Sequence, residues 1–295
     1  MHQDQLRAEV RAILASGQSM ISIGTAIGLS GPVISEWLAG KYKGNNDKVA
    51  KSIEGWLLRH KERKQLPKKV IGFVATTAAR KVFEVARLCH LDGEIGICYG
   101  EAGVGKTRAL LEYAEKNDDV ILVEADLGYT AKVLFQELHR KLGLSGSGPI
   151  NDLKDAVIAK LKKSGRLIIV DEAEHLPYRA LELLRRLNDK AGVGILLVGM
   201  PRLINNLRGK KGEYAQLYSR VGVACKLDGL KPHDTEELVR SLIPGGAHYK
   251  AYHEASQGNA RVLCKLLLRS LRVAEINKLN ITAELIHETA RMLII

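Results

Sequence analysis

A glycine-rich octapeptide, Gly100-Glu-Ala-Gly-Val-Gly-Lys-Thr107, carries the strongest chemical signal in the sequence. It matches the pattern G-x-x-x-x-G-K-[ST], with an apolar run before it and the helix-forming run TRALLEYAEK after it. Glycines let backbone N–H groups curl around phosphates at the positive end of the following helix. Lys106 can then reach the β and γ phosphates, and the Thr107 hydroxyl can bind Mg²⁺. The predicted ATP-binding residues of this loop are Gly100, Gly103, Val104, Gly105, Lys106, Thr107 and Arg108.

Two adjacent carboxylates follow further along the chain, where the apolar run Leu167–Val170 ends in Asp171 and Glu172. Parallel α/β sheets bind ligands at the carboxyl ends of their strands, so this pair is expected beside the phosphate loop. Asp171 is predicted to hold Mg²⁺, directly or through water, and Glu172 to orient and polarise the attacking water. Apolar residues followed by Asp-Glu are common, and a helix N-cap is the alternative explanation.

Alternating strand and helix patterns surround these motifs and predict the elements that position them. Near-continuous apolar runs separated by amphipathic helices are typical of an α/β fold with a parallel sheet covered on both faces. The predicted strands are residues 94–99, 120–125, 166–170, 194–199 and 222–227. The helical patterns between and before them are residues 77–91, 106–116, 130–142, 151–164 and 177–190. After these only helices are predicted, at residues 232–243, 247–256, 259–274 and 282–293.

The phosphate loop, the carboxylate pair and the all-helical end together resemble an AAA+ P-loop ATPase, which implies ATP and Mg²⁺ as cofactors. Two arginines match further positions of that family. Arg220 matches the arginine finger that completes a neighbouring subunit's site, and Arg261 matches the lid arginine that senses the γ-phosphate; ordinary surface arginines are the alternative. One position departs from the pattern. The fourth strand usually ends in a polar residue that helps to position water, and this chain has Met200 there.

Residues 20–38 have the spacing of a helix-turn-helix. Gly24 lets two helices approach, Gly28 takes the turn, and Ser30 is predicted to cap the second helix. Such a second helix enters the DNA major groove in repressor-type folds, although glycine-turned hairpins also occur as plain structural units. Its exposed residues are short and include no Arg, Asn or Gln, so weak sequence preference is expected. The predicted DNA-contacting residues of this segment are Ser30, Ser35, Lys41 and Lys43.

The distribution of charge supports a polyanionic partner. The chain of 295 residues carries a formal net charge of +12, and residues 1 to 70 hold 12 of its 45 Lys and Arg but only 6 of its 33 Asp and Glu. The apolar runs are far shorter than a membrane span, and the N-terminus lacks the apolar core of a signal peptide. A cytoplasmic protein without a membrane partner is expected. The four cysteines, whose spacing favours neither disulfides nor zinc, are Cys89, Cys98, Cys225 and Cys264.

Two segments of the ATPase core are predicted to contact DNA as well. Related filament-forming ATPases place DNA-contacting residues at the start of the helix after the second strand, here Thr130 and Lys132. A basic loop follows the fourth strand. Helix N-termini and lysines can bind DNA phosphates without recognising the base sequence. The alternative is that these residues are ordinary solvated side chains with no DNA contact. The predicted contacts in the basic loop are Arg202, Arg208, Lys210 and Lys211.

The predicted segments and the resemblance that they support extend over nearly the whole chain. The prediction is a helix-turn-helix domain at residues 1–60, a basic linker at 61–75, an ATPase core at 76–229 and helical lid segments at 230–295. This order resembles AAA+ ATPases of phage DNA transposition. The resemblance implies ATP-dependent, largely nonspecific binding to double-stranded DNA, homo-oligomers in the form of a helical filament or ring, capture of target DNA and activation of a transposase. The alternatives are a helicase-loader-like or insertion-sequence helper ATPase, and a nucleotide-switched transcriptional regulator.

Overall fold

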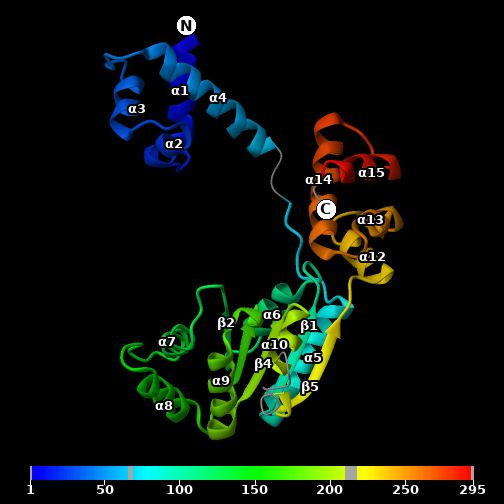
Figure 1. The fold of residues 1–295 in the computed structure, drawn as a ribbon. Coiled ribbons are helices and arrows are strands. Elements are labelled where there is room, and N and C mark those ends of the chain that lie inside the picture. The colour runs from blue at the N-terminus through cyan, green and yellow to red at the C-terminus, as the bar shows by residue number, and fades with distance from the viewer. Residues whose placement is uncertain (1, 66–68, 210–217, 294–295) are drawn as a thin grey trace. The chain divides into compact units, whose positions relative to one another are not determined.

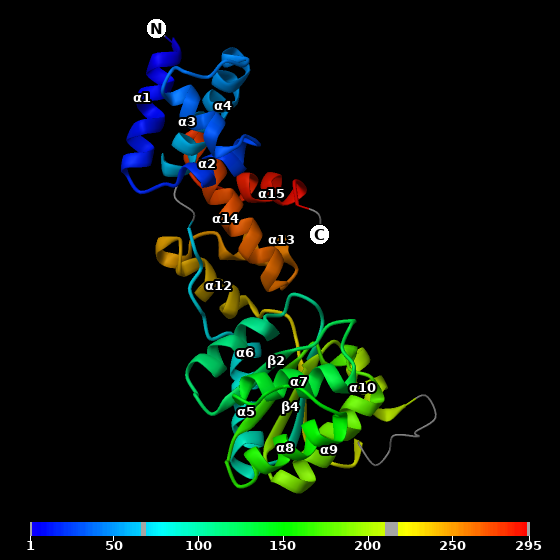
Figure 2. The ribbon, with the colours of Figure 1, turned by 90° about the vertical axis from the view of Figure 1, so that its left-hand side faces the viewer.

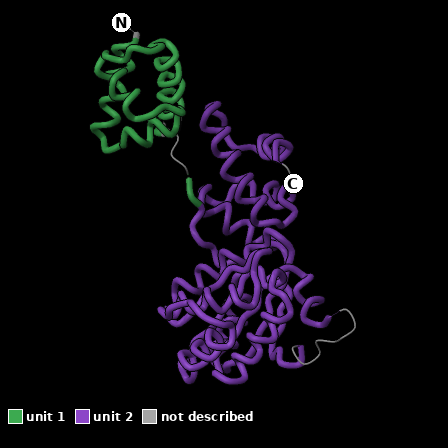
Figure 3. Tube along the Cα trace, turned by 60° about the vertical axis from the view of Figure 1, so that its left-hand side comes forward, with its two compact units in different colours: residues 1–70 green, residues 71–295 purple. Residues whose placement is uncertain are grey.

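The computed structural model describes residues 2–65, 69–209 and 218–293, and divides the chain into two compact units, residues 1–70 and 71–295 (Figure 3). Each unit has a hydrophobic core of its own. Among the described residues, no helix combines the length and the apolar character that crossing a membrane requires. The finer division into four segments stays a prediction.

The first unit is all-helical and consists of α1 (His2–Ala15), α2 (Met20–Ile27), α3 (Gly31–Leu38) and α4 (Asn46–Gln65) (Figure 1). Trp37 and Ile34 of α3 are buried against the other helices. Gly28 ends α2 in the left-handed region, with φ +70°, and a Cβ on Gly24 would lie 2.5 Å from the Leu29 carbonyl oxygen. The sequence therefore needs glycine at both positions to form the turn.

Two expectations for this unit are corrected. Ser30 occupies the N-cap position of α3, but its side chain makes no capping hydrogen bond. The reason is local: Pro32 is the second residue of the helix, so one of the two N–H groups that a cap usually satisfies does not exist. In addition, α4 continues to Gln65, through residues expected to begin a linker, because Lys, Glu, Arg and Gln are good helix formers.

The second unit is built on a five-stranded sheet whose paired strands all run parallel, which confirms the predicted α/β fold. The strand order is β2-β3-β4-β1-β5. Because β1 and β3 both lie next to β4 and point the same way, the residues that follow them meet at one edge of the sheet. The strands are β1 (Ile95–Gly100), β2 (Val120–Glu124), β3 (Leu167–Asp171), β4 (Gly194–Gly199) and β5 (Val221–Leu227).

Helices cover both faces of this sheet, and successive residues of a strand face opposite cores. In β3, Ile168 and Val170 pack in one core with α7 (Ala131–Lys141), α8 (Ile150–Leu161), α9 (Tyr178–Ala191) and α10 (Arg202–Arg208). Leu167 and Ile169 pack in the other core with α5 (Thr77–Asp92) and α6 (Lys106–Glu115). Burial on both faces explains why the strands read as continuous apolar runs.

Four helices at the C-terminal end form a lid with its own core, gathered beyond one end of the sheet (Figure 2). Ile71 and Val74, which precede α5, pack against this lid. Buried Asp234 joins the lid to the sheet domain, because its Oδ1 accepts hydrogen bonds from the backbone N–H (2.6 Å) and hydroxyl (3.0 Å) of Thr77. The lid helices are α12 (Pro232–Arg240), α13 (Tyr249–Ser256), α14 (Ala260–Asn277) and α15 (Ala283–Arg291).

Candidate functional site

The glycine-rich loop links β1 to the first turn of α6, and its backbone has the conformation that only glycine adopts easily. Gly103 has φ +84° and Gly105 φ +100°. Lys106 begins α6, and its Nζ donates hydrogen bonds to the carbonyl oxygens of Gly100 (2.7 Å) and Glu101 (2.9 Å). Burial lowers the pKa of Lys106, while Asp171 and Glu174 act in the opposite direction. The loop thus places a cation and a helix N-terminus where phosphates can bind.

Asp171 ends β3 and lies directly beside this loop. Its side chain accepts hydrogen bonds from the Thr107 hydroxyl, at 2.6 Å, and from the backbone N–H of Glu172, at 2.9 Å. Burial raises the pKa of Asp171, and the hydrogen bond from Thr107 opposes that shift. Adjacent hydroxyl and carboxylate oxygens are ligands that Mg²⁺ prefers, so Thr107 and Asp171 fit the predicted metal site.

Glu172 follows with a backbone that is unusual for a residue with a side chain. Its φ of 51° and ψ of 35° lie in the left-handed region. It stands at the N-cap position of η1 (Ala173–His175) but makes no side-chain capping hydrogen bond there, so capping does not explain the residue. The Glu172 carboxylate is instead half-exposed, with Oε2 3.3 Å from Nε2 of His175. A carboxylate at this position can accept a proton from water.

The loop and the carboxylates line one cavity of about 590 Å³. All predicted ATP-site residues except Gly100 line it, including Arg108 and the lid residue Arg261; Gly100 lies in β1, where a Cβ would approach the Leu227 carbonyl oxygen to 2.6 Å. Met200, whose side chain has no hydrogen-bond donor, lines it as well. Because the phosphate loop, Lys106 and Arg261 lie on one side of the cavity, that polar side can hold phosphates.

The cavity also has an apolar side that the sequence interpretation missed. Segments far apart in the sequence build it: the stretch before α5, then α12 and α14 of the lid. Apolar side chains next to a phosphate-binding loop can bury the base of a nucleotide. The only available signal was the apolar character of residues 70–74 within a stretch interpreted as a basic linker. These apolar lining residues include Ile71, Phe73, Val74, Leu238 and Leu268.

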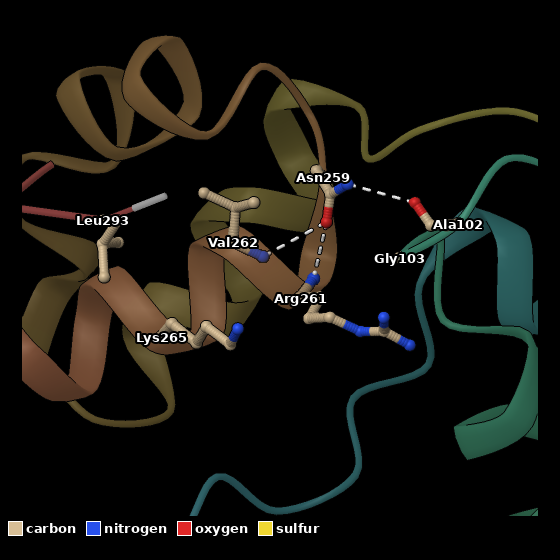
Figure 4. A pocket seen from close by; sticks show the side chains of 7 residues that line it. All are labelled: Ala102, Gly103, Asn259, Arg261, Val262, Lys265 and Leu293. Atoms are coloured by element: carbon tan, nitrogen blue, oxygen red, sulfur yellow. Dashed lines mark hydrogen bonds between the residues drawn. The ribbon is translucent and has the colours of Figure 1, made fainter. Parts of the chain in front are cut away.

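Hydrogen bonds from the first turn of α14 connect the lid to the glycine-rich loop (Figure 4). Asn259 is the N-cap of that helix, and its Nδ2 donates a hydrogen bond to the Ala102 carbonyl oxygen at 3.1 Å. The backbone N–H of Arg261 donates to the Gly103 carbonyl oxygen at 3.2 Å, and a Cβ on Gly103 would lie 2.2 Å from Asn259 Oδ1. Together with Lys265 these residues border a smaller hollow of about 130 Å³. Arg261 therefore lines the nucleotide cavity from the lid, and its contact with phosphate stays a prediction.

Arg220 lies apart from this cavity. It immediately precedes β5, its side chain is exposed, and its Nη1 lies 3.7 Å from Oδ1 of Asp189 in α9. The structure contains one chain, so the predicted role of Arg220 in a neighbouring subunit's site stays a prediction.

The predicted DNA-contacting residues belong to both units. Thr130 caps α7 by accepting a hydrogen bond from the Val133 N–H, and Lys132 beside it is exposed. Arg208 donates a hydrogen bond to the Tyr218 hydroxyl at 2.9 Å, whereas Arg202 lines the cavity. Lys210 and Lys211 lie outside the described residues. The predicted contacts in the first unit are all exposed: Ser30, Ser35, Lys41 and Lys43.

Comparisons with known proteins identify the family. A family model described as an AAA domain matches residues 90–207. The Mu-like prophage FluMu DNA transposition protein B of Haemophilus influenzae is 31% identical over 223 residues, which cover 72% of this chain and 76% of that protein. The chain belongs to the family of Mu-type transposition B proteins. The ATP-dependent target DNA activator B of Escherichia phage D108 is 30% identical over 284 residues, which cover 93% of this chain and 89% of that one.

Solved structures show the same fold at low sequence identity. The Aeropyrum pernix ORC2 protein matches with a TM-score of 0.57 and 17% identity, over 74% of this chain and 68% of that chain. A point variant of Thermotoga maritima RuvB matches with a TM-score of 0.51 and 17% identity, over 77% of this chain and 72% of that chain. These structures show the fold, and the AAA domain match together with the relatives shows that the protein is an ATPase. The cavity beside its glycine-rich loop is its candidate nucleotide site.

Proposed function

We propose that this protein is an ATP-dependent activator of target DNA in transposition. It would bind double-stranded DNA with little sequence preference, assemble into a helical filament or ring, and activate a transposase. The observation that carries the proposal is the Asp171 carboxylate bonded to Thr107 beside the phosphate loop, in a chain 30% identical to a protein named ATP-dependent target DNA activator B. The site supplies the ATP dependence, and the family supplies the reaction.

Each ATP-site residue has one task in this proposal. The loop N–H groups and Lys106 bind the β and γ phosphates, and Thr107 with Asp171 would hold Mg²⁺, which neutralises phosphate charge when bound. Glu172 orients the attacking water and accepts its proton. Arg261 contacts the terminal phosphate from the lid, and Arg220 of one subunit completes the site of the next. Charge-assisted hydrogen bonds from guanidinium groups suit both arginines.

DNA binding would use exposed groups from both units. The formal net charge of +12 favours a polyanion, and the exposed cations lie on the helix-turn-helix segment and around α7 and α10. Contacts to phosphates carry no sequence information, so nonspecific binding is the expected result. Because the ATP site is completed between subunits, nucleotide binding and assembly on DNA are coupled.

Binding of the full-length protein to random duplexes tests the proposal. With ATP and Mg²⁺, electron microscopy should show continuous protein assemblies along an arbitrary plasmid, and competition between unrelated duplexes should show similar affinities. Without nucleotide, or with Lys106→Ala, the assemblies should be absent. Dimers on one palindromic site, independent of ATP, would instead identify a transcriptional regulator. Failure to stimulate strand transfer by a Mu-type transposase would indicate that the ATPase acts on a different partner protein.

A further inference from the structure

A second group of ionisable side chains lines the nucleotide cavity, outside the phosphate loop and the Asp171–Glu172 pair. Glu174 and His175 belong to η1, directly after β3, and Arg202 begins α10, just after β4. Because β3 and β4 are neighbouring parallel strands, the segments after them lie side by side. These three residues therefore surround the same space as Lys106 and Thr107.

Glu174 is an almost completely buried carboxylate, and its hydrogen bonding is incomplete. Its side chain is 2% exposed, and its Oε1 lies 3.6 Å from Nη2 of Arg202. Within the described parts of the chain, no group donates a hydrogen bond to Oε2. Burying a carboxylate costs free energy unless a cation pairs with it. The guanidinium of Arg202 is a cation that pairs with Glu174 here.

The backbone around Glu174 is arranged to hold that carboxylate in place. A Cβ on Gly199, the last residue of β4, would lie 2.1 Å from Glu174 Oε2, so a side chain there would displace the carboxylate from its present position. Asn206 Nδ2 in α10 donates a hydrogen bond to the Glu174 carbonyl oxygen at 3.0 Å. The contact with α10 thus fixes both the side chain and the backbone of Glu174.

Arg202 joins this group to the open part of the cavity. Its Nη2 lies 3.2 Å from Nε2 of His175, and its side chain is 54% exposed. A guanidinium has five donors, and Glu174 and His175 both lie near the same nitrogen, so the remaining donors are available for phosphate oxygens. Met200, two residues earlier, offers no donor. The first cation after β4 is therefore Arg202.

We propose that Arg202 contacts the terminal phosphate of ATP bound to its own subunit, with Glu174 and His175 as positioning residues. This inference rests on the proposed nucleotide site. ATP differs from ADP by the γ-phosphate and its charge, so a cation at this position favours ATP over ADP. The placement of Arg202 inside the cavity argues for this role over the DNA contact predicted from the sequence.

The test compares ATP with ADP binding to full-length Arg202→Ala, by titration with fluorescent analogues of both nucleotides. We expect affinity for the ATP analogue to fall about ten- to a hundredfold, as for a lost hydrogen bond to a charged group, with ADP affinity within about twofold of wild type. Arg202→Lys keeps the charge and should recover part of the preference. Arg240→Ala is the matched control, because Arg240 is 59% exposed, pairs with one carboxylate and lies outside the cavity lining.

Glu174→Gln tests the positioning role with little change in shape. It should give an ATP preference between those of wild type and Arg202→Ala, with an unchanged thermal unfolding midpoint. Equal affinities of wild type and Arg202→Ala for both nucleotides would overturn the proposal, as would equal losses for ATP and ADP. Loss of DNA binding alone would return Arg202 to the DNA-contact role. Normal ATP binding by Lys106→Ala would instead remove the proposed nucleotide site itself.

Discussion

Several side chains in the nucleotide cavity hydrogen-bond to one another, whereas several of those predicted to contact DNA face solvent. Asp171 is 2% exposed and bonded to Thr107, and the lid is bonded to the loop through Asn259. Lys132 of the second unit and Ser35 and Lys41 of the first unit are exposed. Hydrolysis needs reacting groups held to fractions of an ångström, while neutralising DNA phosphates tolerates movement. Substitutions should therefore have large effects in the cavity and small, distributed effects on the DNA-binding surfaces.

The largest effect is expected at the carboxylate that faces water. Glu172→Gln should reduce phosphate release by about a hundredfold or more, because the amide cannot accept the proton, while ATP affinity stays unchanged since Lys106 and Asp171 remain. Glu115→Gln, an exposed residue at the end of α6, is the control. Turnover at the wild-type rate in Glu172→Gln would contradict this prediction, because it would show that hydrolysis does not depend on Glu172 as a base.

The next effect concerns the boundary between subunits. Arg220→Ala should abolish the stimulation of ATP hydrolysis by DNA-driven assembly, with unchanged nucleotide affinity, because the removed group acts on the neighbouring site. Mixing it with Lys106→Ala should restore part of the activity, since each subunit supplies what the other lacks. The measurement is phosphate release at a series of mixing ratios. Co-assembled mixtures that stay inactive would place Arg220 outside the shared site.

A smaller effect is expected on the DNA surface of α7. Lys132→Ala should weaken binding to all duplexes alike and flatten the slope of log K against log salt by about 0.9, the contribution of one phosphate. Nucleotide affinity should not change. Lys160→Ala, an exposed lysine in the last turn of α8, should leave the slope unaltered. An unchanged slope in Lys132→Ala would assign the DNA contact to other surfaces, and deletion of residues 1–65 would show whether the first unit carries it.

The smallest effect separates two serines at equivalent positions in the first unit. Ser19 caps α2 by accepting a hydrogen bond from the Ser22 N–H, whereas Ser30 makes no such bond to α3. Ser19→Ala should destabilise this unit by about 1 kcal/mol, and Ser30→Ala by less than about 0.5 kcal/mol. Both tryptophans of the chain, Trp37 and Trp56, are buried in this unit, so tryptophan fluorescence during denaturation measures it within the full-length protein. Equal losses would show that Ser30 does cap its helix in solution.

Local patterns in the sequence determined most of the fold and the phosphate side of the site. The five strands and the helices that were predicted around them lie within a few residues of their predicted positions, because both faces of the sheet are buried and the apolar runs are long. The segment after β4 is a correction: it was predicted to be a basic loop, and its first part is the helix α10 (Arg202–Arg208). The Gly100–Thr107 loop and Asp171 were predictable because their chemistry needs fixed residue types at fixed spacing. Ser30 failed as a cap because Pro32 changed the donors available to it.

Tertiary structure alone decided how distant segments complete the cavity. The apolar wall from Phe73 and Leu238, the bond from Asn259 to the loop, and the contact of Glu174 with Arg202 all join residues that no local pattern links. A side chain's partner depends on strand order and on which segments follow neighbouring strands, and periodicity carries no information about either. Arg202 therefore reads as one basic residue among several in the sequence, and becomes a phosphate ligand candidate only when β3 and β4 lie side by side.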